Sequence, residues 1–330
     1  MFPSIVSKLN MLDHQQARGN KAEDINKDAV SSDEEFQPLS IHLLIGKNVQ
    51  KVLKGYGPPH KKLLSTYKYE WWIYNENYNS YIQFGVINNK IVTILAVGKD
   101  VNTFPVKIGE SRLDFEEQLK ITNKVVIEEK ASYYRFNLTE EEMKERPLLQ
   151  VIDGIWGQFY FDTVTNQLVG VRYLNKDILL MQRPYSLVYR GKLIEPPFLS
   201  EKQRKSIESG EEGQILEYTN ILRERYGLTK LQWDEAAANT AFNHSKEMKE
   251  LDYFSHLSPL YGGLEERLEH ANIHYIQAGE NIAARYEDGF SAVVGWLNSE
   301  GHRKTLLNKE FTHLGVGVYE KYYTQNFIKH

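Results

Sequence analysis

The chain has 330 residues, a formal net charge of −4, 41% hydrophobic residues and 25% charged residues. This composition is typical of a globular protein with two or three domains, and it excludes a disordered chain. Residues 205–330 carry 13 Lys and Arg against 19 Asp and Glu, and the rest of the chain is close to neutral. Neither part has the basic excess that binding a phosphate backbone requires, so we expect no nucleic acid as a partner.

The chain contains no cysteine, which excludes a disulfide framework, a cysteine zinc site and a thiol nucleophile. The longest strongly apolar run, near Ile91–Val97, is too short to cross a bilayer, so we expect no membrane span in this chain. The first forty residues lack the apolar core of a signal peptide. Residues 1–38 are polar and charged, and we predict a flexible leader there.

Residues 39–190 are predicted to form an α+β domain from two related units, about 41–105 and 106–190. Each unit has a helix-like stretch followed by segments rich in aromatic and β-branched residues, which is typical of antiparallel strands. The alternative is that two unrelated meanders share a similar pattern.

Two offsets indicate the duplication. Ile45-Gly46 and Ile108-Gly109 each open a helix-like stretch and lie 63 residues apart. The strand-like segments 89–92 and 166–169 lie 77 residues apart. An insertion of 14 residues in the second unit explains the difference, and we place it in 138–149.

A linker is predicted at 191–206, because Pro196-Pro197 precedes a charged run rich in Ser and Glu. Residues 207–330 are predicted to form a second α+β domain in which helices lie against a small sheet. The first expected helix has apolar positions from Ile215 to Tyr226 and ends at Gly227. The second is capped by Asp234, and its buried face is Ala236, Ala237, Ala241 and Met248. Two further helices are expected over 263–270 and 291–299, followed by closing strands over 314–319 and 322–328.

Three motifs near the C-terminus contain two imidazoles and a carboxylate. They are Phe254-Ser255-His256, Gly279-Glu280-Asn281-Ile282 and the segment 296–303. Such groups can form a metal site or an acid–base site if they meet around one pocket. For the first motif we expect Phe254 to be buried. His256 is then either a ligand or base at a cavity wall, or a loop histidine bonded to the backbone.

Glu280 has two interpretations, a cap at the start of a buried helix or a group that orients an imidazole or binds a cation. We expect Gly301 to break the helix before it, which places His302 at the start of a short helix as a site residue or a cap. For His313 a half-exposed strand position is the simpler reading, and for His244 a surface or packing role.

From about Ile207 to Phe327 the chain resembles the CAP superfamily (cysteine-rich secretory proteins, antigen 5, plant pathogenesis-related 1) in a short bacterial form. The region before it resembles the CAP-associated N-terminal domain of Firmicute proteins. The matching segments are LQWD at 231–234, FSH at 254–256, GENIAA at 279–284, WLNSEGHRKTLL at 296–307, FTHLGVGV at 311–318 and YYTQNF at 322–327.

The resemblance implies a three-layer α-β-α sandwich with a central cleft. In eukaryotic members two histidines and two glutamates line this cleft and can hold a divalent cation. Those positions fall here on His256, Glu280 and His302, while Ser299 stands where the second glutamate is expected. A zinc or magnesium site is therefore implied at three residues, with less negative charge to offset a dication.

We expect the ligand cleft to include His256, Glu280, Asn281, Ser299, His302 and His313. The resemblance implies an extracellular or cell-envelope protein of a Gram-positive bacterium. Its ligand is then a small molecule, a peptide, a lipid, a glycan or another cell-wall component, with an envelope protein as a further partner.

Two other functions remain open from the sequence. The first is a peptidase-like hydrolase in which His256 and His302 share a metal or act as base and Glu280 orients them or acts as acid. The second is a purely structural interaction module. No residue is assigned a catalytic role by the sequence alone.

Overall fold

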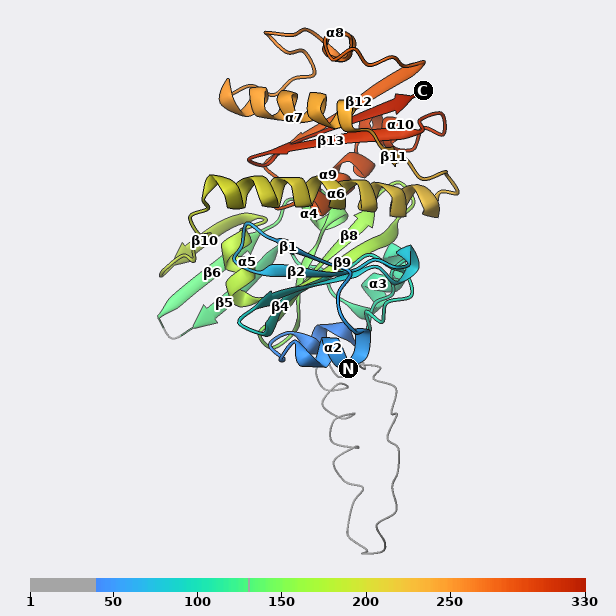
Figure 1. The fold of residues 1–330 in the computed structure, drawn as a ribbon. Helices are drawn as coiled ribbons and strands as arrows, with labels where there is room; N and C mark the ends of the chain where they lie inside the picture. The colour runs from blue at the N-terminus through green and yellow to red at the C-terminus, as the bar shows by residue number, and fades with distance from the viewer. Residues whose placement is uncertain (1–39, 130) are drawn as a thin grey trace, which may run out of the picture.

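The structure is a computed structural model that describes residues 40–129 and 131–330, so the predicted leader lies outside the described residues. It is an α+β fold, as predicted, with two sheet-containing halves. Figure 1 shows the N-terminal half in blue and green below, the C-terminal half in orange and red above, and the long helix α6 between them.

The N-terminal half is built on one antiparallel seven-stranded sheet in the order β1-β2-β3-β4-β9-β8-β7. Strands β4 and β9 pair at its centre, so the triplets β2-β3-β4 and β9-β8-β7 lie in matching positions on either side. The strands are β1 Lys61–Leu64, β2 Glu70–Tyr74, β3 Ile82–Ile87, β4 Lys90–Ala96, β7 Leu148–Ile152, β8 Ile155–Asp162 and β9 Gln167–Asn175.

The two triplets are fastened by the same kind of turn. Gly46 has a φ of 80° and its amide donates to the Ile91 carbonyl at 2.7 Å. Gly109 has a φ of 94° and its amide donates to the Leu168 carbonyl, also at 2.7 Å. Such positive φ values favour glycine. Ile91 and Leu168 are the second residues of β4 and β9 and lie 77 positions apart in the chain.

The second unit contains extra structure between its helix and its strand triplet. The hairpin β5–β6 and helix α4 lie there, and only α4 falls within 138–149, where we placed the insertion. The remaining elements of this half are η1 Ile41–Leu44, α2 Gln50–Tyr56, η2 Tyr78–Ser80, α3 Arg112–Gln118, β5 Lys124–Glu129, β6 Ser132–Asn137, α4 Glu140–Glu145, α5 Lys176–Gln182 and β10 Ser186–Arg190.

Helix α6, Glu201–Arg225, begins inside the predicted linker. A capping box between Ser200 and Gln203 starts it. Tyr226 caps its end, and Gly227 follows at a φ of 68°, which confirms the predicted stop.

The C-terminal half is a three-layer sandwich around a sheet in the order β11-β13-β14-β12. Helix α7 covers one face, and α6 packs on the other. Its elements are β11 Gln232–Trp233, α7 Glu235–Glu250, α8 Leu264–His270, β12 Gln277–Ala284, α9 Gly289–Asn298, α10 Glu300–Leu306, β13 His313–Tyr319 and β14 Tyr322–Lys329.

Helix α7 is capped by Asp234, whose carboxylate accepts from the Ala237 amide at 2.8 Å, as predicted. Ala237, Ala241 and Met248 are buried against the sheet, but Ala236 is exposed, so its expected burial is wrong.

Strand β13 lets α7 approach the sheet very closely. A Cβ at Gly315 would lie 2.1 Å from the Ala238 nitrogen, and one at Gly317 would lie 1.9 Å from the Phe242 nitrogen. Because side chains alternate along a strand, Val316 and Val318 point to the opposite face and are buried there. The glycines of this Gly-Val-Gly-Val segment therefore contact helix α7 on one face of the sheet, and the valines pack into an apolar core on the other face.

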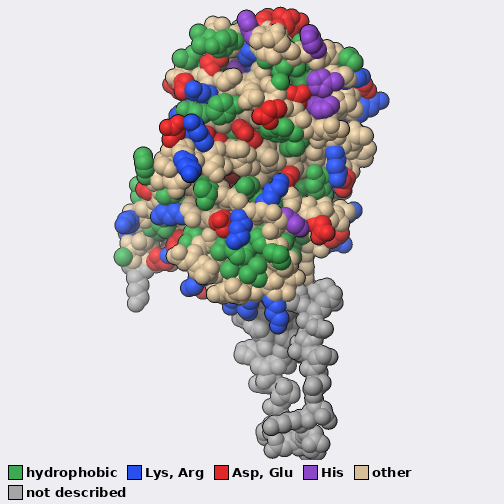
Figure 2. All heavy atoms as spheres, viewed as in Figure 1, with side chains coloured by type: hydrophobic (Ala, Val, Ile, Leu, Met, Phe, Trp, Pro, Cys, Tyr) green, Lys and Arg blue, Asp and Glu red, His purple; other side chains and the backbone are tan. Residues whose placement is uncertain are grey.

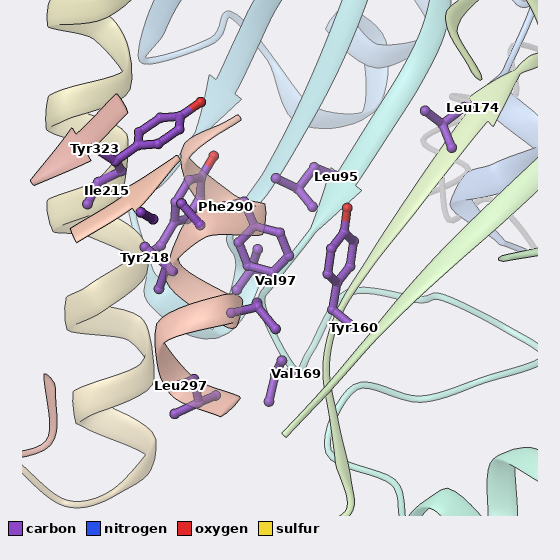
Figure 3. Close-up of a cluster of buried hydrophobic side chains, with 14 of the residues drawn as sticks. Leu95, Val97, Tyr160, Val169, Leu174, Ile215, Tyr218, Phe290, Leu297 and Tyr323 are labelled. Atoms are coloured by element: carbon purple, nitrogen blue, oxygen red, sulfur yellow. The ribbon is translucent and has the colours of Figure 1, made fainter. Parts of the chain in front are cut away.

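The two halves share one hydrophobic core. Phe290 of α9 lies between Tyr218 of α6 and Tyr160 of β8, with ring centroids 5.1 and 4.9 Å away, as Figure 3 shows. Leu95 and Val169 of the large sheet, and Val97 just after β4, belong to the same buried cluster. We infer that the halves pack as one unit.

Ion pairs join the same surfaces. Fully buried Arg172 pairs with Asp288, Arg146 with Glu287 at 2.9 Å, and Arg303 with Asp162 at 2.8 Å. Each links the large sheet or its connections to the segment around α9 and α10.

On the outer surface, charges of both signs are mixed. In Figure 2 the Lys and Arg side chains lie among Asp and Glu side chains over both halves of the face drawn. No helix among the described residues is long and apolar enough to cross a membrane.

The close approach of α7 gives a stability test. Gly317→Ala should lower the free energy of unfolding by about 2 kcal/mol or more, because its methyl group would displace the helix backbone. Gly301→Ala is the matched control, since nothing lies within 4 Å of its added Cβ in α10. It should leave stability unchanged or raise it by about 0.5 kcal/mol. Chemical denaturation measures both, and equal effects would contradict the packing argument.

Candidate functional site

The predicted carboxylate lies on an edge strand of the sandwich. Residues 279–284 form most of β12, so Glu280 does not begin a helix, and the capping interpretation is wrong. In the sheet Glu280 pairs with Asn326 of β14. Alternation along β12 directs Glu280 toward α8 and Asn281 toward α10, on the other face.

Glu280 binds two cationic or imidazole side chains. His256 Nδ1 lies 2.8 Å from Glu280 Oε1. The Arg267 guanidinium donates to Glu280 Oε2 at 2.8 Å, to Oε1 at 3.0 Å and to the His256 carbonyl at 3.0 Å. The side chains of Glu280 and Arg267 are only 3% and 4% exposed, while His256 is 56% exposed. A buried ion pair thus orients a largely exposed imidazole.

The balance of forces on Glu280 keeps it ionised. Burial pushes the pKa of Glu280 upward, but hydrogen bonds from His256 and Arg267 and the charge of Arg267 outweigh burial and leave the pKa below its ordinary value. A lowered carboxyl pKa contributes stability above the unfolded pKa, and this contribution is lost as the pH falls through the folded pKa.

His244 supports the loop that carries His256. Its ring is buried on α7, and Nε2 lies 3.0 Å from the Ser255 carbonyl. Burial, followed by the charge of Arg267, lowers the pKa of His244. A neutral ring can donate from Nε2 to the carbonyl, so His244 packs inside and positions the loop.

The second imidazole reaches the same place from the opposite face of the sheet. His302 lies on α10, its Nδ1 is 2.9 Å from Ser299 Oγ, and its ring centroid is 6.2 Å from that of His256. Burial, followed by the charge of His256, lowers the pKa of His302. The structure therefore brings His256, Glu280 and His302 together at the edge of β12.

The local route to His302 differs from our expectation. Helix α9 ends at Asn298, Ser299 separates it from α10, and Gly301 lies inside α10. Gly301 therefore does not break a helix. Ser299 is the junction residue, and its hydroxyl holds the imidazole one turn later.

The other expected cleft residues have different positions. Asn281 is fully buried and its amide lies 3.2 Å from the His302 carbonyl, so it supports α10 from inside. Glu300, next to Ser299, is 86% exposed and pairs with Lys304. His313 does not join the cluster, because its ring packs on His330, 4.7 Å away, and His330 binds Asp234 at the start of α7.

A cavity of about 530 Å³ lies beside His302. Ser299, His302 and Arg285 are its polar lining residues. Ile282, Trp296 and Tyr322 are among its apolar lining. Phe254 is also part of the lining and is 54% exposed, so its expected burial is wrong. An exposed aromatic ring at the rim is available to a ligand.

The available chemistry comes from the two imidazoles. The Nε2 atoms of His256 and His302 form no hydrogen bond within residues 40–129 and 131–330. A neutral His256 that donates from Nδ1 to Glu280 presents a lone pair at Nε2. Each ring can therefore bind a hydroxyl or carbonyl group of a ligand or accept a proton.

The residues do not fit a metal held by Glu280. Within the described part of the chain, no group of three or more His, Cys, Asp or Glu is placed to hold a metal ion. Both oxygens of Glu280 bind Arg267, whose charge already balances the carboxylate. A dication at Glu280 would have to displace the buried guanidinium of Arg267. Leaving a buried charge without its partner costs about 3–5 kcal/mol.

Sequence reasoning missed Arg267 and gave His244 only a packing or surface role. A signal for Arg267 exists, because Leu264, Arg267 and Leu268 share one face of a short helix at spacings of three and four. An arginine on an apolar face needs a buried partner. Nothing in the sequence says that the partner is Glu280.

Comparisons with known proteins place the site in a family. The CAP-associated N-terminal family matches residues 45–185, and the cysteine-rich secretory protein family matches residues 216–328. A Bacillus subtilis protein, named as the uncharacterized membrane protein YlbC, is 47% identical over 92% of this chain and 88% of its own length. The chain belongs to the CAP family, with a CAP-associated N-terminal domain. This is the family that the motifs resemble.

Solved structures agree with this assignment. An extracellular SCP-domain protein from Bacillus anthracis is 43% identical and has a TM-score of 0.84, covering 94% of this chain and 99% of its own. A cysteine-rich secretory protein from Staphylococcus aureus, 23% identical with a TM-score of 0.78, covers 88% of this chain and 93% of its own and shows the same fold.

The buried pair in the CAP domain should be strongly coupled. Glu280→Gln leaves Arg267 buried without its counter-charge and should lower the free energy of unfolding by about 3–5 kcal/mol. Arg267→Met should also destabilise, but the double variant should lose less than the sum of the two. Chemical denaturation of all four proteins tests this, with His313→Gln as a control that should change little. Additive losses would contradict the coupling.

The pKa of His302 should respond to its neighbour. In the native CAP domain, NMR titration should give His302 a pKa below its ordinary value of 6.5. His256→Gln removes the nearby positive charge and should raise that pKa, though burial keeps it below the ordinary value. A lowered histidine pKa means that this group's contribution to stability falls as the pH drops below the unfolded value. An unchanged pKa in the variant would show that the rings are not coupled.

Proposed function

We propose that this protein is an extracytoplasmic binding protein whose CAP cleft holds part of a cell-wall component. The observation that carries the proposal is the imidazole of His302 in the wall of a cavity of about 530 Å³, with the exposed ring of His256 next to it at a centroid distance of 6.2 Å. Small-ligand sites have this size and combine an apolar lining with a few placed polar groups.

The lining limits the class of ligand. Trp296, Tyr322 and exposed Phe254 supply flat apolar surfaces, which suit a sugar ring or an apolar side chain. His256 and His302 then bind hydroxyl or amide groups of the same molecule. A glycan or glycopeptide fits this combination better than a pure lipid does, because the polar wall would leave hydrogen-bonding groups unpaired against a hydrocarbon chain.

The proposed location draws on the relatives. The protein from Bacillus anthracis is described as extracellular and matches 94% of this chain. The Bacillus subtilis relative is named a membrane protein, which is compatible with attachment at the outer face of the membrane. A cleft facing the wall would have access to glycan and peptide fragments.

Binding of soluble peptidoglycan fragments tests the proposal. Isothermal titration calorimetry should detect binding to the full chain, and His256→Gln and His302→Gln should each weaken it by about tenfold, the loss of roughly 1.4 kcal/mol expected for a hydrogen bond to a ligand. Glu280 keeps Arg267 in the His256 variant, so the fold should persist. His313→Gln is the matched control and should bind like the native protein. Equal losses in all three variants, or no binding by the native chain, would overturn the proposal.

One observation favours a hydrolase as the second candidate. A buried carboxylate that holds Nδ1 of a histidine leaves Nε2 in the position that a general base uses. Mass spectrometry of wall fragments incubated with the protein tests this function. Products that form with the native chain and disappear with His256→Gln would establish catalysis, whereas intact fragments would leave binding as the function.

A further inference from the structure

A second cavity lies where the two domains meet. It has a volume of about 340 Å³ and contains residues of both halves. Arg146 and Arg183 come from the ends of α4 and α5, whereas Arg285 and Glu287 follow β12 and Lys321 lies in the turn between β13 and β14. The site therefore exists only because the N-terminal domain packs on the CAP domain.

The cavity is strongly positive. Its lining has four cationic side chains and a single carboxylate, that of Glu287. Both oxygens of Glu287 already bind Arg146, at 2.9 and 3.1 Å. Arg285 and Lys321 form no ion pair with a carboxylate within residues 40–129 and 131–330; Lys321 Nζ contacts the hydroxyl and ring of Tyr67, and its charge also acts on buried Glu211. Among the described residues, these two cations thus have no directly bound carboxylate.

A buried amide in the lining also lacks a partner. Gln182 is only 6% exposed and its Oε1 forms no hydrogen bond, while Nε2 lies 3.4 Å from the Tyr69 hydroxyl. The oxygen and nitrogen of such an amide can exchange places. In the exchanged state the Tyr69 hydroxyl donates to Oε1, and Nε2 is left to donate to a ligand. Buried polar atoms are normally satisfied, so the orphaned group points to an absent partner.

The basic cavity continues the ligand cleft. Ala284, Arg285 and Tyr286 line both the 340 Å³ cavity and the 530 Å³ cavity beside His302. A single extended ligand could occupy both.

We propose that the domain junction is a phosphate-binding subsite that holds an anionic group of the ligand bound in the CAP cleft. Arginine forks bind phosphate oxygens through paired hydrogen bonds, and a dianionic phosphate matches the two positive charges of Arg285 and Lys321 better than a single carboxylate does. This proposal rests on the proposed function, because it assigns the phosphate to the ligand that binds in the CAP cleft. Arg285 and Lys321 are the residues that bind the phosphate, and Gln182 donates to it.

Calorimetric titration of inorganic phosphate into the full chain at low salt tests the subsite. One phosphate should bind per chain, and the double variant Arg285→Gln, Lys321→Gln should weaken this binding by about tenfold or more, as loss of two charge-assisted contacts implies. Lys304→Gln with Lys309→Gln is the matched control, because it removes the same charge at exposed positions outside the cavity. It should change the affinity less than about twofold, as expected for screened surface charge. Equal weakening in both double variants, or no phosphate binding by the native chain, would overturn the proposal.

Further titrations separate the source of the phosphate and the two proposals. A soluble oligo(glycerol phosphate) that binds more tightly than inorganic phosphate, and loses that advantage in His302→Gln, would show one polymer spanning both cavities. Equal affinities would assign the subsite to the free anion. If the native chain binds phosphate but no wall fragments, only the proposed function is contradicted. Fragment binding that needs His256, with phosphate binding unchanged in Arg285→Gln, Lys321→Gln, would sink only the subsite.

Discussion

Helix α6 is buried on two sides, and this packing sets the position of both halves. Its Ile215 and Tyr218 contribute to a core that also contains residues of the seven-stranded sheet and of β13. A helix packed between two sheets cannot move relative to one without losing apolar contact with the other. We infer that α6 fixes the relative position of the two sheets, and that α9 and α10 are placed by the same core.

Polar contacts across the junction make the position of His302 depend on the N-terminal domain. Arg303, the residue after His302, donates to both oxygens of Asp162 at the end of β8. Asn298, just before the α9–α10 junction, donates to the Phe161 carbonyl at 2.8 Å and accepts from the Thr163 amide at 2.9 Å. The segment that carries one wall of the CAP cleft is thus fastened to the large sheet on both sides of Ser299.

Two buried carboxylates of the CAP domain, Glu280 and Asp288, have different roles. Glu280 is balanced by Arg267 within the domain, and the exposed part of this network is the ring of His256. Asp288 is balanced by Arg172 across the junction. Buried ion pairs add little net stability over apolar packing, but each demands one particular partner. The first pair fixes a loop to the cleft, and the second fixes one domain to the other.

The family, the α+β class and the three-layer sandwich could be predicted from the sequence. Short-range rules also gave the Asp234 cap and the Gly227 stop, because these depend on neighbours along the chain. The same rules failed at Ala236, Phe254 and Gly301, where burial or helix ends are decided by packing from distant segments.

For the site, the order of the motifs determined that His256, Glu280 and His302 belong together, and the structure brings them to one strand edge. Only the tertiary structure decided three other features. These are the pairing of Arg267 with Glu280, the position of His313 away from the cluster, and the basic cavity at the domain junction. The physical reason is that the type of a residue determines which interactions it needs when it is buried. Which residue becomes its partner depends on how separate helices and strands pack around the shared core.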